Sequence, residues 1–307
     1  MKKIIALAVA AVVAAPAMAD MTIGATVAAG YTNTSYEAPA TPATSTAFAT
    51  AADTDNGGFG IDTASVTIKG SETLENGLTI SGAMGMGGLN RGTGTVDGEN
   101  ANLTVSGDFG SIAVNSGRGG SGISGVAGDA ENLTGEVANY GAGDSDNEGV
   151  KLTLPAMGGV TFAINASETV GLGDGDDGRT LGYIASGKFG PVSVGADYYD
   201  FKSGGRTRIN LGVDLGAAVV KLGHESRDNR GSEMAVGVTV PMGALSLGAA
   251  YATSETDATG DKDASGYSVG ATYTLSDNVS VNAKYASWDA ADGNDYTKSA
   301  VLMTLAF

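Results

Sequence analysis

Short segments in which apolar residues alternate with small or polar residues recur along most of this 307-residue chain. A clear example reads Val-Ser-Val-Asn-Ala-Lys-Tyr over residues 279–285. A period of two residues indicates a β-strand with one apolar face, and no stretch beyond the first twenty residues competes as an amphipathic helix. The chain is therefore predicted to be all-β.

Sixteen segments of this kind can be delimited, and the connections between them alternate in length. Short turns on one rim and long, acidic, Gly-rich loops on the other are typical of a transmembrane antiparallel β-barrel. The longest predicted loops cover residues 32–59 and 119–148. The predicted strands are residues 22–31, 60–70, 78–88, 101–106, 111–118, 149–154, 160–167, 180–188, 192–201, 206–215, 217–225, 232–240, 245–253, 265–275, 279–287 and 297–307.

The last ten residues indicate that the sheet is closed. They end on Phe307, and their apolar side chains fall on one face of the predicted strand, with Leu302 as an exception on the other face. An apolar strand at the edge of an open sheet would be an aggregation site. Pairing residues 297–307 with residues 22–31 removes that edge, as a closed membrane barrel requires.

The first residues have the pattern of a secretory signal peptide. Lys2 and Lys3 precede an apolar run that ends at Pro16, and Ala17-Met18-Ala19 fits the small-residue cleavage site. A transmembrane anchor is the alternative, but the run is short for a span of about 20 residues. We expect residues 1–19 to be removed and residues 20–307 to form one barrel domain.

Composition excludes several classes of function. The chain has 17 basic and 34 acidic residues, so its formal net charge is −17, and without Lys2 and Lys3 it becomes 15 − 34 = −19. Such a chain should not bind nucleic acid, whose affinity depends on neutralised phosphates. With no Cys and the single His224, no nucleophile–base pair stands out. An outer-membrane hydrolase that uses His224 is the weakest alternative, and we expect no enzyme.

Several predicted strands carry charge on the face opposite their apolar residues. Arg206 and Arg208 share one face of residues 206–215, and Lys151 and Lys284 occupy similar positions. A soluble sandwich would turn such a face to water. In a closed barrel with sixteen strands, the apolar face meets lipid and the polar face lines an aqueous channel.

Two turns resemble those of the Gram-negative general diffusion porins. They read Lys-Gly-Ser-Glu-Thr-Leu-Glu-Asn-Gly-Leu over residues 69–78, and Leu-Thr-Val-Ser-Gly-Asp-Phe-Gly-Ser-Ile over residues 103–112, followed by Gly117-Arg118. The resemblance implies a homotrimeric outer-membrane channel, surrounded by lipid and lipopolysaccharide, for passive diffusion of small hydrophilic solutes. It also implies that the barrel assembly machinery reads the terminal Phe307.

In that family the loop after the fifth strand folds into the barrel and narrows the pore, which implies a constriction loop at residues 119–148 here. Its acids would face a basic wall across a water-filled gap, and the opposed charges would create a transverse field. The expected loop acids are Asp129, Glu131, Glu136, Asp144 and Asp146. The expected wall residues are Arg118, Lys151, Arg206, Arg208 and Lys284.

The acidic net charge predicts a preference for cations, although a basic wall at the constriction could reverse it. The alternative function is a structural or adhesive barrel whose acidic loops bind partners. Residues 171–178 read Gly-Leu-Gly-Asp-Gly-Asp-Asp-Gly, a single copy of a pattern that calcium-binding β-helices repeat in tandem. A solvated acidic loop is favoured there, with a loop-bound divalent cation such as calcium as the alternative, and no other cofactor is expected.

Aromatic residues are distributed unevenly along the chain. Phe109 is the only one between Gly60 and Asn139, whereas fourteen lie between Tyr140 and Phe307. Because aromatic side chains concentrate at membrane interfaces, the later strands are predicted to face lipid. The first five strands, with small and aliphatic outward residues, are predicted to form the trimer contact.

Overall fold

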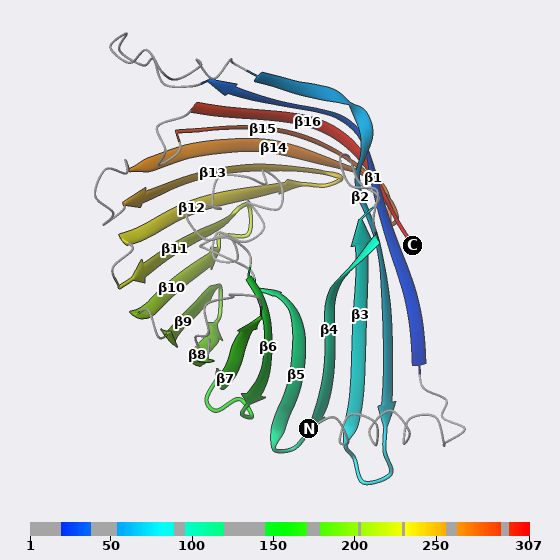
Figure 1. Cartoon of the computed structure of the whole chain (residues 1–307), viewed down its shortest axis with the longest axis vertical. Helices are drawn as coiled ribbons and strands as arrows, with labels where there is room; N and C mark the ends of the chain where they lie inside the picture. The colour runs from blue at the N-terminus through cyan, green and yellow to red at the C-terminus, as the bar shows by residue number, and fades with distance from the viewer. Residues whose placement is uncertain are drawn as a thin grey trace.

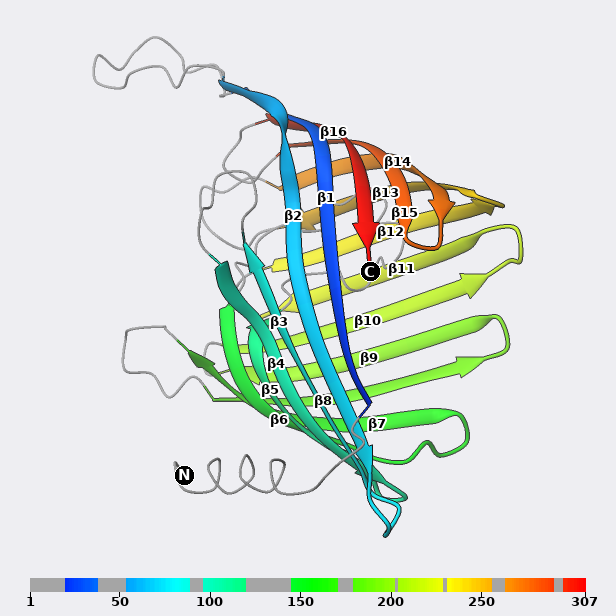
Figure 2. The same cartoon turned by 90° about the vertical axis from the view of Figure 1, so that its right-hand side faces the viewer.

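The computed structural model describes residues 20–37, 54–88, 96–119, 145–170, 179–201, 204–228, 231–255, 263–289 and 295–307. These residues form sixteen antiparallel strands in a closed barrel, in which each strand pairs with its neighbours in sequence and β1 pairs with β16 (Figures 1 and 2). No helix among them is long and apolar enough to cross a membrane. The strands are β1 Asp20–Glu37, β2 Thr54–Thr73, β3 Thr79–Gly88, β4 Val96–Gly107, β5 Gly110–Gly119, β6 Ser145–Thr153, β7 Val160–Val170, β8 Arg179–Phe189, β9 Val192–Phe201, β10 Gly204–Asp214, β11 Val219–Arg227, β12 Gly231–Met242, β13 Leu245–Glu255, β14 Ala264–Ser276, β15 Val279–Asp289 and β16 Asp295–Ala306.

The barrel closes between β1 and β16, as the sequence predicts. Figure 2 shows the C-terminus beside β1, where the Phe307 amide donates to the Ala25 carbonyl at 2.9 Å. Leu302 lies opposite Gly30 in this register and is only 6% exposed. A side chain at position 30 would overlap the Val301 carbonyl oxygen. The missing side chain of Gly30 lets the two strands approach closely, and the apolar exception Leu302 is buried beside it.

Strand boundaries deviate from the predictions mainly at the long-loop ends. β9 has the predicted bounds, but β1 continues to Glu37 and β2 begins at Thr54, so the loop between them is shorter than predicted. The extra residues of β1 include Asn33, Thr34 and Ser35, which are polar on both faces. Backbone hydrogen bonds continue there without an apolar alternation, so the periodicity could not reveal them.

The predicted constriction loop is also shorter at its end. β6 begins at Ser145, and the β5–β6 register pairs Asp146 with Arg118. The assignment of Asp146 to the loop is therefore wrong. The stretch Ser-Asp-Asn-Glu over residues 145–148 is polar throughout, so no apolar alternation marks the start of the strand there.

The two faces of the barrel differ in exposure, because the convex outer face is more open than the concave inner face. On β16, Val301 and Met303 are 54% and 55% exposed, whereas Ala300 is 2% exposed. Register pairs carry this alternation from strand to strand, so outward and interior positions can be assigned all around the barrel. Many large aliphatic and aromatic side chains of the strands are exposed, and they give the outer face the apolar band that lipid requires.

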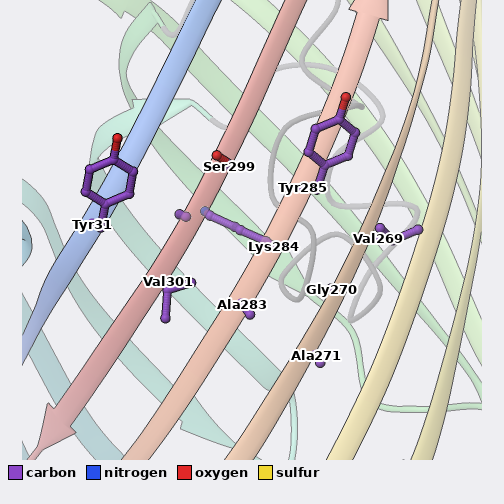
Figure 3. A pocket seen from close by; sticks show the side chains of 10 residues that line it. Tyr31, Val269, Gly270, Ala271, Ala283, Lys284, Tyr285, Ser299 and Val301 are labelled. Atoms are coloured by element: carbon purple, nitrogen blue, oxygen red, sulfur yellow. The ribbon is translucent and has the colours of Figure 1, made fainter. Parts of the chain in front are cut away.

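The outer wall carries one shallow depression over β14, β15, β16 and β1. Figure 3 shows Tyr31 and Tyr285 projecting on either side of β16, with Ala271 and Ala283 beneath them. Lys284 extends from β15 across toward β16 in the same view. Lys284 and Ala300 border the depression from interior positions, and the outward side chains around it are apolar or hydroxylic, so it belongs to the apolar outer surface.

Candidate functional site

The interior faces of β9, β10 and β11 bring together a cluster of charged and aromatic side chains. Alternation turns the apolar residues of these strands outward, as Ile209 illustrates with its 54% exposure. The register places Arg208 between Asp197 and Glu225, and Arg206 between Tyr199 and Arg227. We call the following residues the interior charge cluster: Asp197, Tyr199, Phe201, Arg206, Arg208, Glu225 and Arg227.

Arg208 is held by Asp197 in a two-pronged ion pair. Its Nε lies 3.0 Å from both carboxylate oxygens, and one Nη lies 2.9 Å from Oδ2. The two side chains are 18% and 11% exposed. A planar guanidinium matches a carboxylate in this bidentate way, so the pair fixes both side chains on the interior wall.

Glu225 is the most deeply buried charged residue in the described part of the chain, with 1% exposure. Arg227, on the same strand, donates to Glu225 Oε1 through its Nε. Arg208 Nε lies 4.0 Å from Glu225 Oε2. The Glu225 carboxylate therefore lies between two guanidinium groups, which offset the cost of its burial.

Arg206 differs from the other two arginines because aromatic rings hold it instead of a carboxylate. Its Cζ lies 4.7 Å from the centre of the Tyr199 ring and 5.3 Å from that of Phe201. These distances are those of cation–π interactions. Among the described residues no ion pair is recorded for Arg206, and its Nε is buried without a hydrogen-bond partner.

Glycines in neighbouring strands make room for these larger side chains. A Cβ at Gly182 would collide with the Tyr199 ring, and one at Gly195 would collide with the Asn210 amide. Gly182 lies opposite Tyr199 in the β8–β9 register, so the ring lies over the bare backbone of the adjacent strand. Large interior side chains are thus accommodated next to glycines, which have no side chain to collide with them.

With the cluster included, basic side chains outnumber acidic ones on the interior face of the described strands. Their positions follow from register pairs with buried interior residues, as when Lys298 pairs with Ala286, which is 1% exposed. The basic residues are Lys69, Lys151, Lys188, Arg206, Arg208, Lys221, Arg227, Lys284 and Lys298, and the acidic residues are Asp20, Asp197, Asp214, Glu225 and Glu233.

The predicted wall residues are distributed around the barrel and are not gathered at one point. Lys151 lies on β6 at an interior position. Lys284 lies on β15, opposite the interior residue Ala300 of β16. Arg206 and Arg208 fall within the interior charge cluster. Arg118 belongs to β5, but its side chain and that of Asp146 lie outside the described part. Four predicted loop acids lie entirely outside the described residues, namely Asp129, Glu131, Glu136 and Asp144.

Sequence reasoning missed most partners of the two arginines. Asp197 and Tyr199 occupy interior positions of a strand whose bounds were predicted correctly. The alternation along that strand could therefore have placed both side chains on the interior face. Arg227 was missed because the predicted strand ended at residue 225, whereas β11 continues to Arg227. Glu225 was passed over because nothing in a single strand shows which cation lies beside it.

The alternatives that involve catalysis or metal find no support at the cluster. His224 pairs with Ile209 on the outward side of the wall, so it does not face the charged interior. Within the described residues no group of three His, Asp or Glu side chains could hold a metal ion. The Gly/Asp stretch at residues 171–178 lies outside the described part.

An antiparallel barrel of sixteen strands with an apolar outer face and a charged interior is the architecture of an outer-membrane channel. A family model described as Gram-negative porin matches residues 6–293. The chain belongs to the Gram-negative porin family. It is therefore a passive diffusion channel of the bacterial outer membrane, a class of protein distinct from enzymes.

Solved porin structures share this fold at low sequence identity. The anion-selective porin from Comamonas acidovorans has a TM-score of 0.69 and 16% identity, over 94% of this chain and all of that one. A triple mutant of the Rhodopseudomonas blastica porin has a TM-score of 0.65 and 14% identity, with the same shares covered. No curated protein sequence matches the chain.

Proposed function

We propose that the channel admits small hydrophilic solutes and ions without a preferred neutral substrate, and that its interior wall favours anions. The observation that carries this proposal is the excess of basic over acidic side chains on the interior of the described strands. The surplus is spread over β2, β6, β8, β10, β11, β15 and β16. A solute in the lumen therefore meets positive potential from several sides of the wall.

The acidic net charge of the whole chain pointed the other way and predicted cation preference. The influence of each charge depends on its distance from a solute in the lumen. At physiological ionic strength, charges beyond about 8 Å from a solute are largely screened. The basic residues of the interior wall face the lumen directly, so we give the interior charge more weight than the total. The anion selectivity of the Comamonas porin, which shares the fold, is consistent with this choice.

Passive passage can be tested by liposome swelling with the purified protein. Reconstituted vesicles should swell in isotonic arabinose or glycine and should swell more slowly as the solute becomes larger. The adhesive alternative, a barrel that displays acidic loops, predicts no swelling above that of empty vesicles. Swelling for one sugar alone, with no dependence on solute size, would contradict the absence of a preferred substrate.

We also propose that the channel is a homotrimer whose contact is formed by the first five strands. Apart from Tyr31 and Phe59, their large outward residues are mainly aliphatic, such as Leu103 and Val114 with exposed fractions of 42% and 52%. The outward residues of later strands include tyrosines such as Tyr183, Tyr251 and Tyr267. Tyrosine suits a lipid interface, whereas small and aliphatic side chains allow two barrel walls to pack closely.

Replacing Val114 by arginine should convert trimers into monomers on a native gel. The charge would be placed in a dry contact between subunits, where no partner neutralises it. Val194→Arg is the matched control, because Val194 is also outward, is 39% exposed, and lies on β9 near a short turn. Both substitutions carry the cost of a charge at the lipid face, about 2–4 kcal/mol at mid-depth. Dissociation of both variants, or of neither, would contradict the assigned contact.

Several further features belong to this proposal. Residues 1–19 would direct export and be removed, and Phe307, which is 65% exposed at the end of the closing strand, would be read by the assembly machinery. Outer-membrane lipid and lipopolysaccharide would surround the tyrosine-rich face. The inward fold of the loop after β5, and a cation bound at residues 171–178, remain predictions.

A further inference from the structure

We propose that Arg206 is a binding site for small organic monocarboxylates in transit through the channel. This inference rests on the proposed function, since it names a solute class for the basic wall. The site consists of the Arg206 guanidinium with its two aromatic supports, Tyr199 and Phe201, and is flanked by the ion pairs of Arg208 and Arg227.

The geometry of Arg206 holds the guanidinium in place without neutralising it. The Tyr199 and Phe201 rings are nearly parallel, at 25°, with centres 6.1 Å apart, and both lie within 5.3 Å of the Arg206 Cζ. Aromatic rings interact with the face of a guanidinium, whereas its N–H donors point outward in its plane. The stacking therefore leaves Nη donors for a carboxylate, and the positive charge is retained.

The neighbouring residues Arg208 and Arg227 already form ion pairs with carboxylates. Arg206 is therefore the arginine of the cluster that can bind an anion. Asp197 occupies Arg208 in a bidentate pair, and Glu225 occupies Arg227. Three guanidiniums against two carboxylates leave one positive charge. In the β11–β12 register Glu233 lies directly opposite Glu225, and Lys221 lies four residues from Glu225 along β11, so counting both leaves the surplus at one positive charge. A single surplus charge suits a monoanion, whereas a dianion would also be repelled by Asp197 and Glu225.

The hydrogen bonding of the cluster is incomplete among the described residues. Arg206 Nε, Arg227 Nη2 and Glu225 Oε2 are buried without a hydrogen-bond partner. Buried polar groups are rarely left unsatisfied in native proteins. Two of the three unsatisfied atoms are guanidinium donors, so the cluster is short of acceptors.

The test is the single-channel conductance of the purified protein in planar bilayers, measured against sodium butyrate concentration. Binding predicts that conductance saturates, whereas unhindered diffusion predicts a linear rise. In Arg206→Gln the half-saturating concentration should rise roughly tenfold, as expected for the loss of one bidentate charge-assisted pair. Arg206→Lys should show the same rise, because lysine keeps the charge but not the planar fork.

Controls separate this site from general charge effects. Lys151→Gln removes one interior charge elsewhere and should change half-saturation by less than about twofold. Tyr199→Leu removes one aromatic support of the guanidinium and should raise the half-saturating concentration as Arg206→Gln does. Linear conductance of the native channel in butyrate, or native saturation in Arg206→Lys, would overturn the site. Stronger saturation by succinate or phosphate would overturn the monocarboxylate assignment, and the absence of any channel would instead overturn the proposed function.

Discussion

Replacing Lys151, Arg206 and Lys284 together by glutamine should remove most of the anion preference of the channel, because the excess of basic over acidic interior residues falls from four to one. All three occupy interior positions, and no ion pair is recorded for any of them among the described residues. Their removal therefore leaves no carboxylate without its partner, and the barrel should fold as before. The zero-current potential across a potassium chloride gradient should move most of the way toward zero.

The matched control removes the same formal charge elsewhere in the chain. Lys202→Gln, Arg230→Gln and Lys262→Gln lower the net charge by the same three units, at positions outside the described strands. If the total charge governs selectivity, both triple variants should shift the potential equally. If the interior wall governs it, the control should stay close to the native value. Equal shifts would contradict the wall-based account.

Replacing Arg227 by methionine should destabilise the barrel by about 3 kcal/mol, the lower end of the cost of breaking a buried ion pair. Glu225 is 1% exposed and would lose its closest cation, leaving only Arg208 at 4.0 Å. Methionine keeps much of the volume of the arginine stem, so packing changes little. The midpoint of urea unfolding, followed by the gel mobility of the folded barrel, measures the effect.

The double variant Arg227→Met, Glu225→Leu tests the cause of that loss. Replacing a buried pair by apolar residues of similar size is often neutral. The double variant should therefore recover most of the stability that the single variant loses. A single variant as stable as the native barrel would show that Glu225 is hydrated or otherwise compensated, and would contradict the buried pair.

The fold could be predicted from sequence because a barrel strand has a simple signal. Period-two alternation identified sixteen strands, and the apolar end at Phe307 indicated that the last strand pairs with the first, which the register confirms. The signal fails where strands continue into water, because residues such as Asn33 and Asp146 carry no apolar face. Hydrogen bonding continues there even though the alternation stops.

The pairing of side chains across strands was harder to predict, because it depends on the centre of each turn. The predicted connection at residues 202–205 would have placed Arg208 opposite Tyr199, whereas β10 begins at Gly204 and Arg208 faces Asp197. When the centre of the turn shifts by one residue, each residue is paired with a partner two residues away from the predicted one. The side chains stay on the same face of the sheet, but each has a different cross-strand neighbour. Interior parity was therefore predictable for Arg206 and Arg208, whereas their ion pairs and ring contacts required the register.

The central claim is that charge on the interior wall, and not the net charge of the chain, sets the ion preference of this porin. The zero-current potential of the native channel in a tenfold potassium chloride gradient tests it most directly. The account predicts a potential with the sign of chloride permeation. A potential with the sign of potassium permeation would contradict it, and would indicate that the carboxylates outside the described strands dominate the pore.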